Sequence, residues 1–204
     1  SNHVTPNEID TVFHRNLERV QTVIGTYTTA VGPRQGRPSV ANSDLLRAAV
    51  VLLHATLEDL LRMVAQERLP TAAPAVLATI PLPVGTQRKQ RFDLAALAIP
   101  AYRSLEVQEV IDLAVREYLE QANYNHPGDI RNLLEQVGLD PKLLIAHAGD
   151  IGAMNSRRHL IVHRADANDA TGRGQHPARS LARRTVEAWL SAVQEFGNAV
   201  IHAM

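Results

Sequence analysis

The residues best suited to chemistry lie in one stretch of the chain, from Arg157 to Asp166. The stretch contains three arginines, two histidines and one aspartate: Arg157, Arg158, Arg164, His159, His163 and Asp166. Histidine can accept or donate a proton near neutral pH, and a guanidinium group can bind a phosphate and stabilise charge on its oxygens. The apolar residues 160–162 between the polar ones are expected to hold the segment against the core as a rigid helix, which a site requires.

The basic charge of the chain is concentrated around this stretch, although the formal net charge is zero. Residues 157–184 carry seven arginines and two aspartates, a net charge of +5, and the rest of the chain carries −5. The neutral total argues against a histone-like nucleic-acid binder, and the 45% hydrophobic content argues against intrinsic disorder. Of the 21 cations 19 are arginine, a bias that genome composition alone can also produce.

The spacing of Arg158 and His163 constrains how the two residues could act together. In an ideal helix, residues five positions apart are separated by about 140° around the axis and by roughly 7.5 Å along it. The pair therefore does not share a narrow face of one helix. The long arginine side chain can cover part of the distance, and a two-fold axis beside the helix could bring the pair into one cleft shared by two chains.

The elements that must position this stretch are all predicted to be helices. Thr5-Pro6-Asn7-Glu8 has the pattern of a capping box and starts the first of them. The first helix is expected over 5–30, and the second over 43–68 with Asn42 or Ser43 as its cap. A third is capped by Ser104 and has its apolar positions within 107–119, and a fourth covers 129–137 and is closed by Gly138. Three more are expected: one that starts at Asp140-Pro141, one that carries residues 151–162, and a last one from about Pro177.

The sequence therefore predicts an all-α fold, a bundle of four to five main helices forming a single domain over residues 1–204. A proline-rich, irregular insertion is expected over residues 70–103. No apolar run is long enough to indicate a membrane span, and a cytoplasmic protein is expected. Residues 1–3 are expected to be the remnant of a cleaved tag. Cysteine is absent, so a metal would need histidine and carboxylate ligands.

The segment Arg158-His159-Leu160-Ile161-Val162-His163 resembles the motif of the HEPN superfamily, which is an arginine, a polar residue, a few further positions and then a histidine. The all-α layout also resembles that superfamily. Within it, the segments Leu57–Arg62 and Arg158–Asp166 are most similar to the RiboL-PSP-HEPN type. The resemblance covers most of residues 40–200.

The resemblance implies a metal-independent endoribonuclease, a hydrolase that acts as a homodimer and uses no cofactor. His163 would be the general acid or base, Arg158 would stabilise the scissile phosphate, and His159 would be a supporting contact. RNA supplies its own 2′-hydroxyl nucleophile, and the expected products are a 2′,3′-cyclic phosphate and a 5′-hydroxyl. The implied roles are those of toxins or defence proteins, and the implied partners are an RNA substrate and an antitoxin or another defence-system protein.

An earlier helix is expected to support the motif. Glu58 is placed there as the acidic group that orients it, and Arg47, His54, Glu58 and Arg62 fall at helical spacing, as a polar stripe. The expected RNA contacts are Arg157, Arg164, Asp166 and Arg62. The stripe is equally compatible with an ordinary solvated face.

Three other interpretations of the motif remain open on the sequence alone. The arginines could be the cations of a helix C-terminal turn, which offset the helix dipole. His159 and His163 are four residues apart, as metal ligands on a helix often are, with His147, Asp166 or His176 as a third ligand. The chain could also be a non-catalytic HEPN-like module that binds a nucleotide, an RNA or a protein partner.

Overall fold

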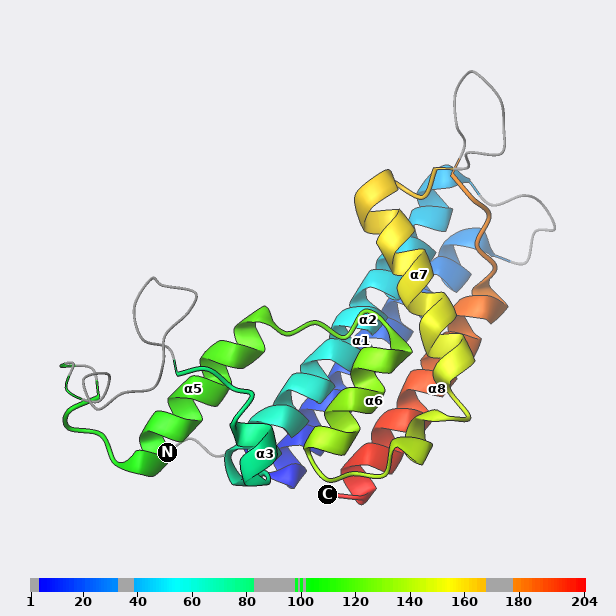
Figure 1. Ribbon diagram of the computed structural model, residues 1–204. Helices are drawn as coiled ribbons and strands as arrows, with labels where there is room; N and C mark the ends of the chain where they lie inside the picture. The colour runs from blue at the N-terminus through cyan, green and yellow to red at the C-terminus, as the bar shows by residue number, and fades with distance from the viewer. Residues whose placement is uncertain (1–3, 33–38, 83–97, 99, 101, 168–177) are drawn as a thin grey trace.

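The computed structural model (Figure 1) describes residues 4–32, 39–82, 98, 100, 102–167 and 178–204. Within these ranges every regular element is a helix, which confirms the all-α fold. The elements are α1 (Pro6–Val31), α2 (Val40–Arg68), η1 (Leu69–Thr71), α3 (Pro74–Leu77), α5 (Val107–Gln121), α6 (Pro127–Gln136), η2 (Pro141–Leu144), α7 (Ala148–Arg164) and α8 (Arg183–His202). None of the helices in these ranges combines the length and the apolar character needed to cross a membrane.

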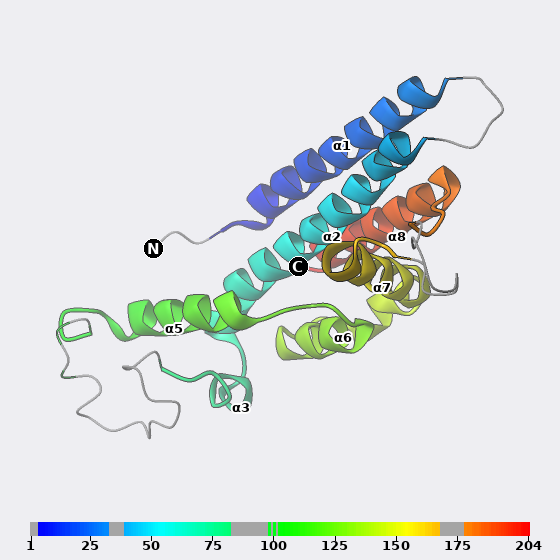
Figure 2. The ribbon, with the colours of Figure 1, turned by 90° about the horizontal axis from the view of Figure 1, so that it is seen from above.

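Helix α2 is the centre of the bundle and packs against α1, α5, α6, α7 and α8. Figure 2 shows α1, α2 and α8 running side by side, with α7 next to α2 and α8. In both views α3 and α5 lie near the C-terminal end of α2. One hydrophobic core joins all six long helices, and its largest fully buried side chains include Phe13, Leu57 and Phe196. The helix that carries the motif, α7, is therefore fixed on the central helix.

Local capping explains where most helices begin. Thr5 caps α1 as predicted, because its backbone N–H donates to the Glu8 carboxylate at 2.8 Å and its hydroxyl accepts from the Glu8 N–H at 3.3 Å. The predicted start of α2 was wrong, since Ser39 is the cap and its hydroxyl accepts from the Asn42 N–H at 3.1 Å. The cap of α5 is Glu106 rather than Ser104, with its N–H donating to Glu109 at 2.8 Å.

The start of α8 was also predicted too early. Pro177 lies outside the described residues, and residues 178–182 that follow it are not helical. The carbonyl of Arg179 accepts hydrogen bonds from Arg47 at 2.7 Å and from Arg157 at 2.9 Å, and that of Ser180 accepts from Arg157 at 3.0 Å. The side chains of Arg47 and Arg157 therefore hold the carbonyls of this non-helical segment, and the helix starts only at Arg183.

The expected insertion at 70–103 contains two short helical turns in its described part, η1 and α3. Residues 83–97, 99 and 101 of it lie outside the described ranges. The helix expected after Asp140-Pro141 is the 3-10 turn η2, in which the Asp140 carboxylate accepts from the Lys142 N–H at 2.8 Å.

Gly197 of α8 lies where this helix packs closely against α1 and α2. A Cβ atom at this position would overlap the ring of Phe13 in α1 and touch Leu60 in α2, and both side chains are fully buried. We expect Gly197→Ala to lower the free energy of unfolding by about 1–3 kcal/mol, measured by urea denaturation, because overpacking forces neighbouring groups to shift. Gly25→Ala is the matched control, since Gly25 is exposed in the interior of α1 with open space around it.

The control should stabilise the protein by about 0.5–1 kcal/mol, because alanine loses less backbone entropy than glycine in a helix. Equal unfolding free energies for the two variants would contradict the proposed packing at Gly197.

Candidate functional site

Helix α7 carries the whole arginine–histidine motif. Its inner side places Ile151 and Met154 in the core, and the helix ends at Arg164. Ala165 and Asp166 follow with positive φ values of 47° and 58°, and the N–H groups of both donate to the carbonyl of Leu160. This left-handed turn ends the helix directly after the motif and redirects the chain.

His159 and His163 lie next to each other on the exposed side of α7. Their ring centroids are 4.6 Å apart, and the ring planes are inclined by 45°. His159 also lines an open hollow of about 480 Å³, whose other lining residues are Asn125, His126, Asn155, Ser156 and Leu160. The His159 imidazole is therefore accessible to a ligand that enters this hollow, and the His163 ring lies against it.

Arg158 lies on another side of α7 and is partly buried next to a polar cluster of α2. His54 is 1% exposed, and its Nδ1 lies 3.8 Å from the Glu58 carboxylate. Burial lowers the pKa of His54, the negative charge of Glu58 opposes that effect, and the positive charge of Arg158 lowers the pKa further. A side-chain hydrogen bond between His54 and the nearby Asn125 raises the pKa of His54, as Glu58 does. The net result is a buried histidine that favours its neutral form between an arginine and a glutamate.

The stability of the protein should consequently fall when the pH is lowered through about 6.5, the ordinary pKa of histidine. Because the pKa of His54 is lower in the folded than in the unfolded state, the unfolded state binds more protons in this range. This contribution to stability is complete above the ordinary value and is lost as the pH falls. The change in the free energy of unfolding with pH is measured by urea unfolding of the wild type and of His54→Gln at about pH 7.5 and about pH 5.5.

The acid-induced loss should be smaller in His54→Gln than in the wild type, and unchanged in His202→Gln, which replaces an exposed histidine. Equal losses in the wild type and in His54→Gln would show that His54 does not titrate in this way.

The polar stripe of α2 is not a solvated face, because its members are buried or bind other segments of the chain. Arg47 and His54 are buried, and Glu58 accepts a hydrogen bond from the Tyr124 N–H at 3.4 Å. Arg62 donates to the carbonyls of Leu119 and Ala122 at the C-terminal end of α5. The alternative of an ordinary solvated face is therefore wrong, and Glu58 and Arg62 fix the end of α5 and the segment between α5 and α6.

Arg157 and Asp166 form a buried ion cluster with Arg47. Asp166 is fully buried, and its carboxylate lies 2.8 Å from Nε of Arg47 and 2.8 Å from Nε of Arg157. The same two arginines also hold the carbonyl of Arg179, as described above. The cluster thus ties α2, α7 and the segment before α8 together.

The residues predicted for the site consequently fall into three groups. His159 and His163 are paired at the surface, whereas Arg158 and Glu58 meet at the buried His54. The third group contains the expected RNA contacts. Arg157 and Asp166 bind each other, Arg62 binds backbone carbonyls, and Arg164 is exposed at the end of α7.

Sequence reasoning missed two asparagines of the site. Asn155 is buried in α7 and donates to the carbonyls of Tyr124 at 3.3 Å and Asn125 at 2.9 Å, while its Oδ1 has no hydrogen-bond partner. Asn125 approaches His54 and lines the hollow. The only available signal was a polar residue on the otherwise apolar side of α7, next to Met154.

A metal site at the histidine pair would need a third ligand. Among the described residues no group of three histidines, cysteines or carboxylates lies close enough to hold an ion. His176, one of the three expected candidates, lies outside those residues, and Asp166 is occupied by two arginines.

Comparison of the chain with known proteins adds no further assignment. No protein-family model, curated protein or solved structure matches it. The functional interpretation therefore rests on the residues of the site and their geometry.

Proposed function

We propose that the protein is a metal-independent endoribonuclease of the HEPN type, with a toxin- or defence-like role in the cytoplasm. The observation that carries the proposal is the arrangement on α7. An exposed His163 lies against His159 beside an open hollow, and Arg158 on the same helix is held next to His54 and Glu58.

The proposed reaction uses the 2′-hydroxyl of the RNA as its nucleophile. His163 takes the proton of the 2′-hydroxyl or gives one to the leaving oxygen, while the 2′-oxygen attacks phosphorus and the bond to the 5′-oxygen breaks. The guanidinium of Arg158 stabilises the charge that develops on the phosphate oxygens, and His159 makes a supporting contact. The products are a 2′,3′-cyclic phosphate and a 5′-hydroxyl, and no cofactor takes part.

A homodimer would allow both residues to reach one phosphate. Arg158 is directed toward α2, whereas His163 is exposed, so one copy of α7 presents the two groups on different sides. Val162, directly before His163, is 50% exposed and offers an apolar contact to a second chain. We propose that two α7 helices meet across a two-fold axis, and that Arg158 of one chain acts with His163 of the other.

The arginines near the motif take different parts in this proposal. Arg164 lies exposed at the end of α7, where it can contact the RNA backbone. Arg157, Asp166 and Arg62 bind groups of the protein, and we assign them to supporting the site. An antitoxin or another defence-system protein would act by covering the exposed histidine pair.

The test is incubation of the purified protein with RNA in EDTA, followed by analysis of the fragment ends. We expect fragments with 2′,3′-cyclic phosphate and 5′-hydroxyl ends. Intact RNA that remains bound to the protein would favour the alternative, a non-catalytic HEPN-like module. Cleavage that occurs only after addition of a divalent metal would contradict the proposed mechanism.

A further inference from the structure

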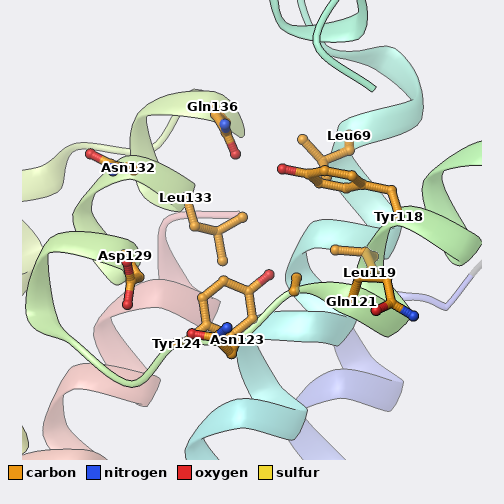
Figure 3. A pocket seen from close by; sticks show the side chains of 11 residues that line it. Leu69, Tyr118, Leu119, Gln121, Asn123, Tyr124, Asp129, Asn132, Leu133 and Gln136 are labelled. Carbon is orange, nitrogen blue, oxygen red and sulfur yellow. The ribbon is translucent and has the colours of Figure 1, made fainter. Parts of the chain in front are cut away.

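A second hollow, of about 330 Å³, lies at the α5–α6 connection, which also lines the hollow that contains His159. Figure 3 shows it between the end of α5, the start of the connection and helix α6. Its polar lining consists mainly of carboxamides and phenols, contributed by Tyr118, Gln121, Asn123, Tyr124, Asn132 and Gln136.

The lining is polar but offers no cation to an anionic ligand. Among the described residues that line this hollow there is no lysine, arginine or histidine. Its one carboxylate, that of Asp129, accepts a hydrogen bond from the His126 N–H at 3.0 Å. Burial raises the pKa of Tyr124 to about 12, so its hydroxyl stays neutral and able to donate a hydrogen bond. Such a lining suits an uncharged ligand with several donors and acceptors, and disfavours a phosphate.

The residues that line the hollow suit a planar ligand. Leu69, Leu119 and Leu133 supply apolar surface, and the Tyr118 ring lies at one side (Figure 3). The side chains of Asn132 and Gln136 lie on the opposite side, on α6. A ring with a flat apolar face and hydrogen-bonding edges, which describes a nucleobase, can stack on the tyrosine and pair with the amides.

The five residues between α5 and α6, 122–126, line both hollows. Asn123 and Tyr124 face the second one, whereas Asn125 and His126 face the one that contains His159. Glu58 and Asn155 hold this segment from behind through the backbone of Tyr124 and Asn125. A strand whose phosphate lies beside His159 therefore has a pocket for an unstacked base within reach, on a rigid support.

We propose that this second hollow binds one nucleobase of a single-stranded RNA and gives the enzyme a base preference near its cleavage site. The base preference near the cleavage site rests on the proposed ribonuclease function. Binding of a base does not rest on it, because binding can be measured without cleavage. The tests use the full chain, with two exposed or half-buried amides of α6 removed together in the variant Asn132→Ala/Gln136→Ala. Asn198→Ala, at an exposed amide of α8, is the matched control.

The first measurement is titration with each of the four ribonucleosides, which carry no phosphate, followed by NMR of the side-chain amides. We expect one nucleoside to bind more tightly than the others. In the double variant its affinity should fall by about five- to hundredfold, since each of the two lost hydrogen bonds corresponds to about a two- to tenfold change. The control should bind as the wild type does. Absence of binding to the wild type, or equal binding to both variants, would overturn the proposal.

The second measurement is the base distribution around the cuts made in a random-sequence RNA. The double variant should cut with a flatter distribution than the wild type and Asn198→Ala. If nucleosides bind as expected but no RNA is cut, the proposed ribonuclease function fails and base binding stands. If RNA is cut with the same distribution by all three proteins, the ribonuclease function stands and the base pocket is wrong.

Discussion

Replacing His163 by alanine should lower the rate of RNA cleavage in EDTA by a factor of about 10²–10⁴, the usual contribution of a general acid or base. Arg158→Ala should lower the rate by about 10²–10³, because it removes the group that stabilises charge on the phosphate. His163 is exposed and Arg158 only partly buried, so both variants should keep the fold. Single-turnover cleavage of a labelled RNA measures the effect, with circular dichroism to check folding.

Matched controls for this prediction lie on other helices. His202→Ala removes an exposed histidine at the end of α8, and Arg131→Ala removes an exposed arginine of α6. Both should cleave at the wild-type rate. If His163→Ala also cleaves at that rate, His163 is not the acid or base and the proposed mechanism is wrong.

Mixing the two inactive variants tests whether the site is shared between chains. A dimer of one His163→Ala chain and one Arg158→Ala chain contains one shared site in which both residues are intact. After exchange of subunits, the mixture should therefore recover about one quarter of the wild-type activity, since half of the dimers are mixed and each has one intact site. If the site lies within one chain, mixing restores nothing.

The largest effect on stability is expected at Asp166. Asp166→Ala should lower the free energy of unfolding by about 3–5 kcal/mol, because it leaves the guanidinium groups of Arg47 and Arg157 without their buried counter-ion. The carboxylate is fully buried between the two arginines, at 2.8 Å from each. Urea denaturation followed by circular dichroism measures the change.

Arg47 also supplies the control for this prediction. It pairs with the carboxylate of Asp44 at 3.0 Å, but that side chain is 62% exposed. Asp44→Ala should therefore change the free energy of unfolding by no more than about 1 kcal/mol, as for other exposed ion pairs. In Asp166→Asn the side chain keeps its shape and the backbone can keep its positive φ. The loss of stability in this variant should therefore reflect mainly the lost negative charge. Equal stabilities of Asp166→Ala and Asp44→Ala would show that burial of the cluster has no energetic importance.

Two adjacent arginines show how far the tertiary structure changes the interpretation of the motif. Arg157 and Arg158 are of the same type and stand next to each other, directly before the two histidines. In the structure, Arg157 is bound to Asp166 and to the carbonyls of Arg179 and Ser180, whereas Arg158 lies by the polar cluster of α2. Arg157→Ala should thus reduce stability, and Arg158→Ala should reduce activity in a folded protein.

The sequence by itself determined the fold class and the approximate position of most helices. Helical periodicity and capping depend on residues three or four positions apart, so Thr5 with Glu8 and Asp140 with Lys142 could be recognised locally. The starts of α2 and α8 were missed for different reasons. Ser39 offered a cap one turn earlier than Asn42 or Ser43, and α8 is delayed by side chains from α2 and α7.

Only the tertiary structure decided what the polar residues do. Arg47 and Asp166 are 119 positions apart, and Glu58 and Tyr124 are 66 apart, so no local pattern connects them. The same stripe on α2 would be a solvated face if no polar partner lay opposite it. Whether a charged residue acts in a site, at the surface or as a structural contact depends on its burial and on the groups that face it. Segments distant in the sequence supply the burial and the facing groups.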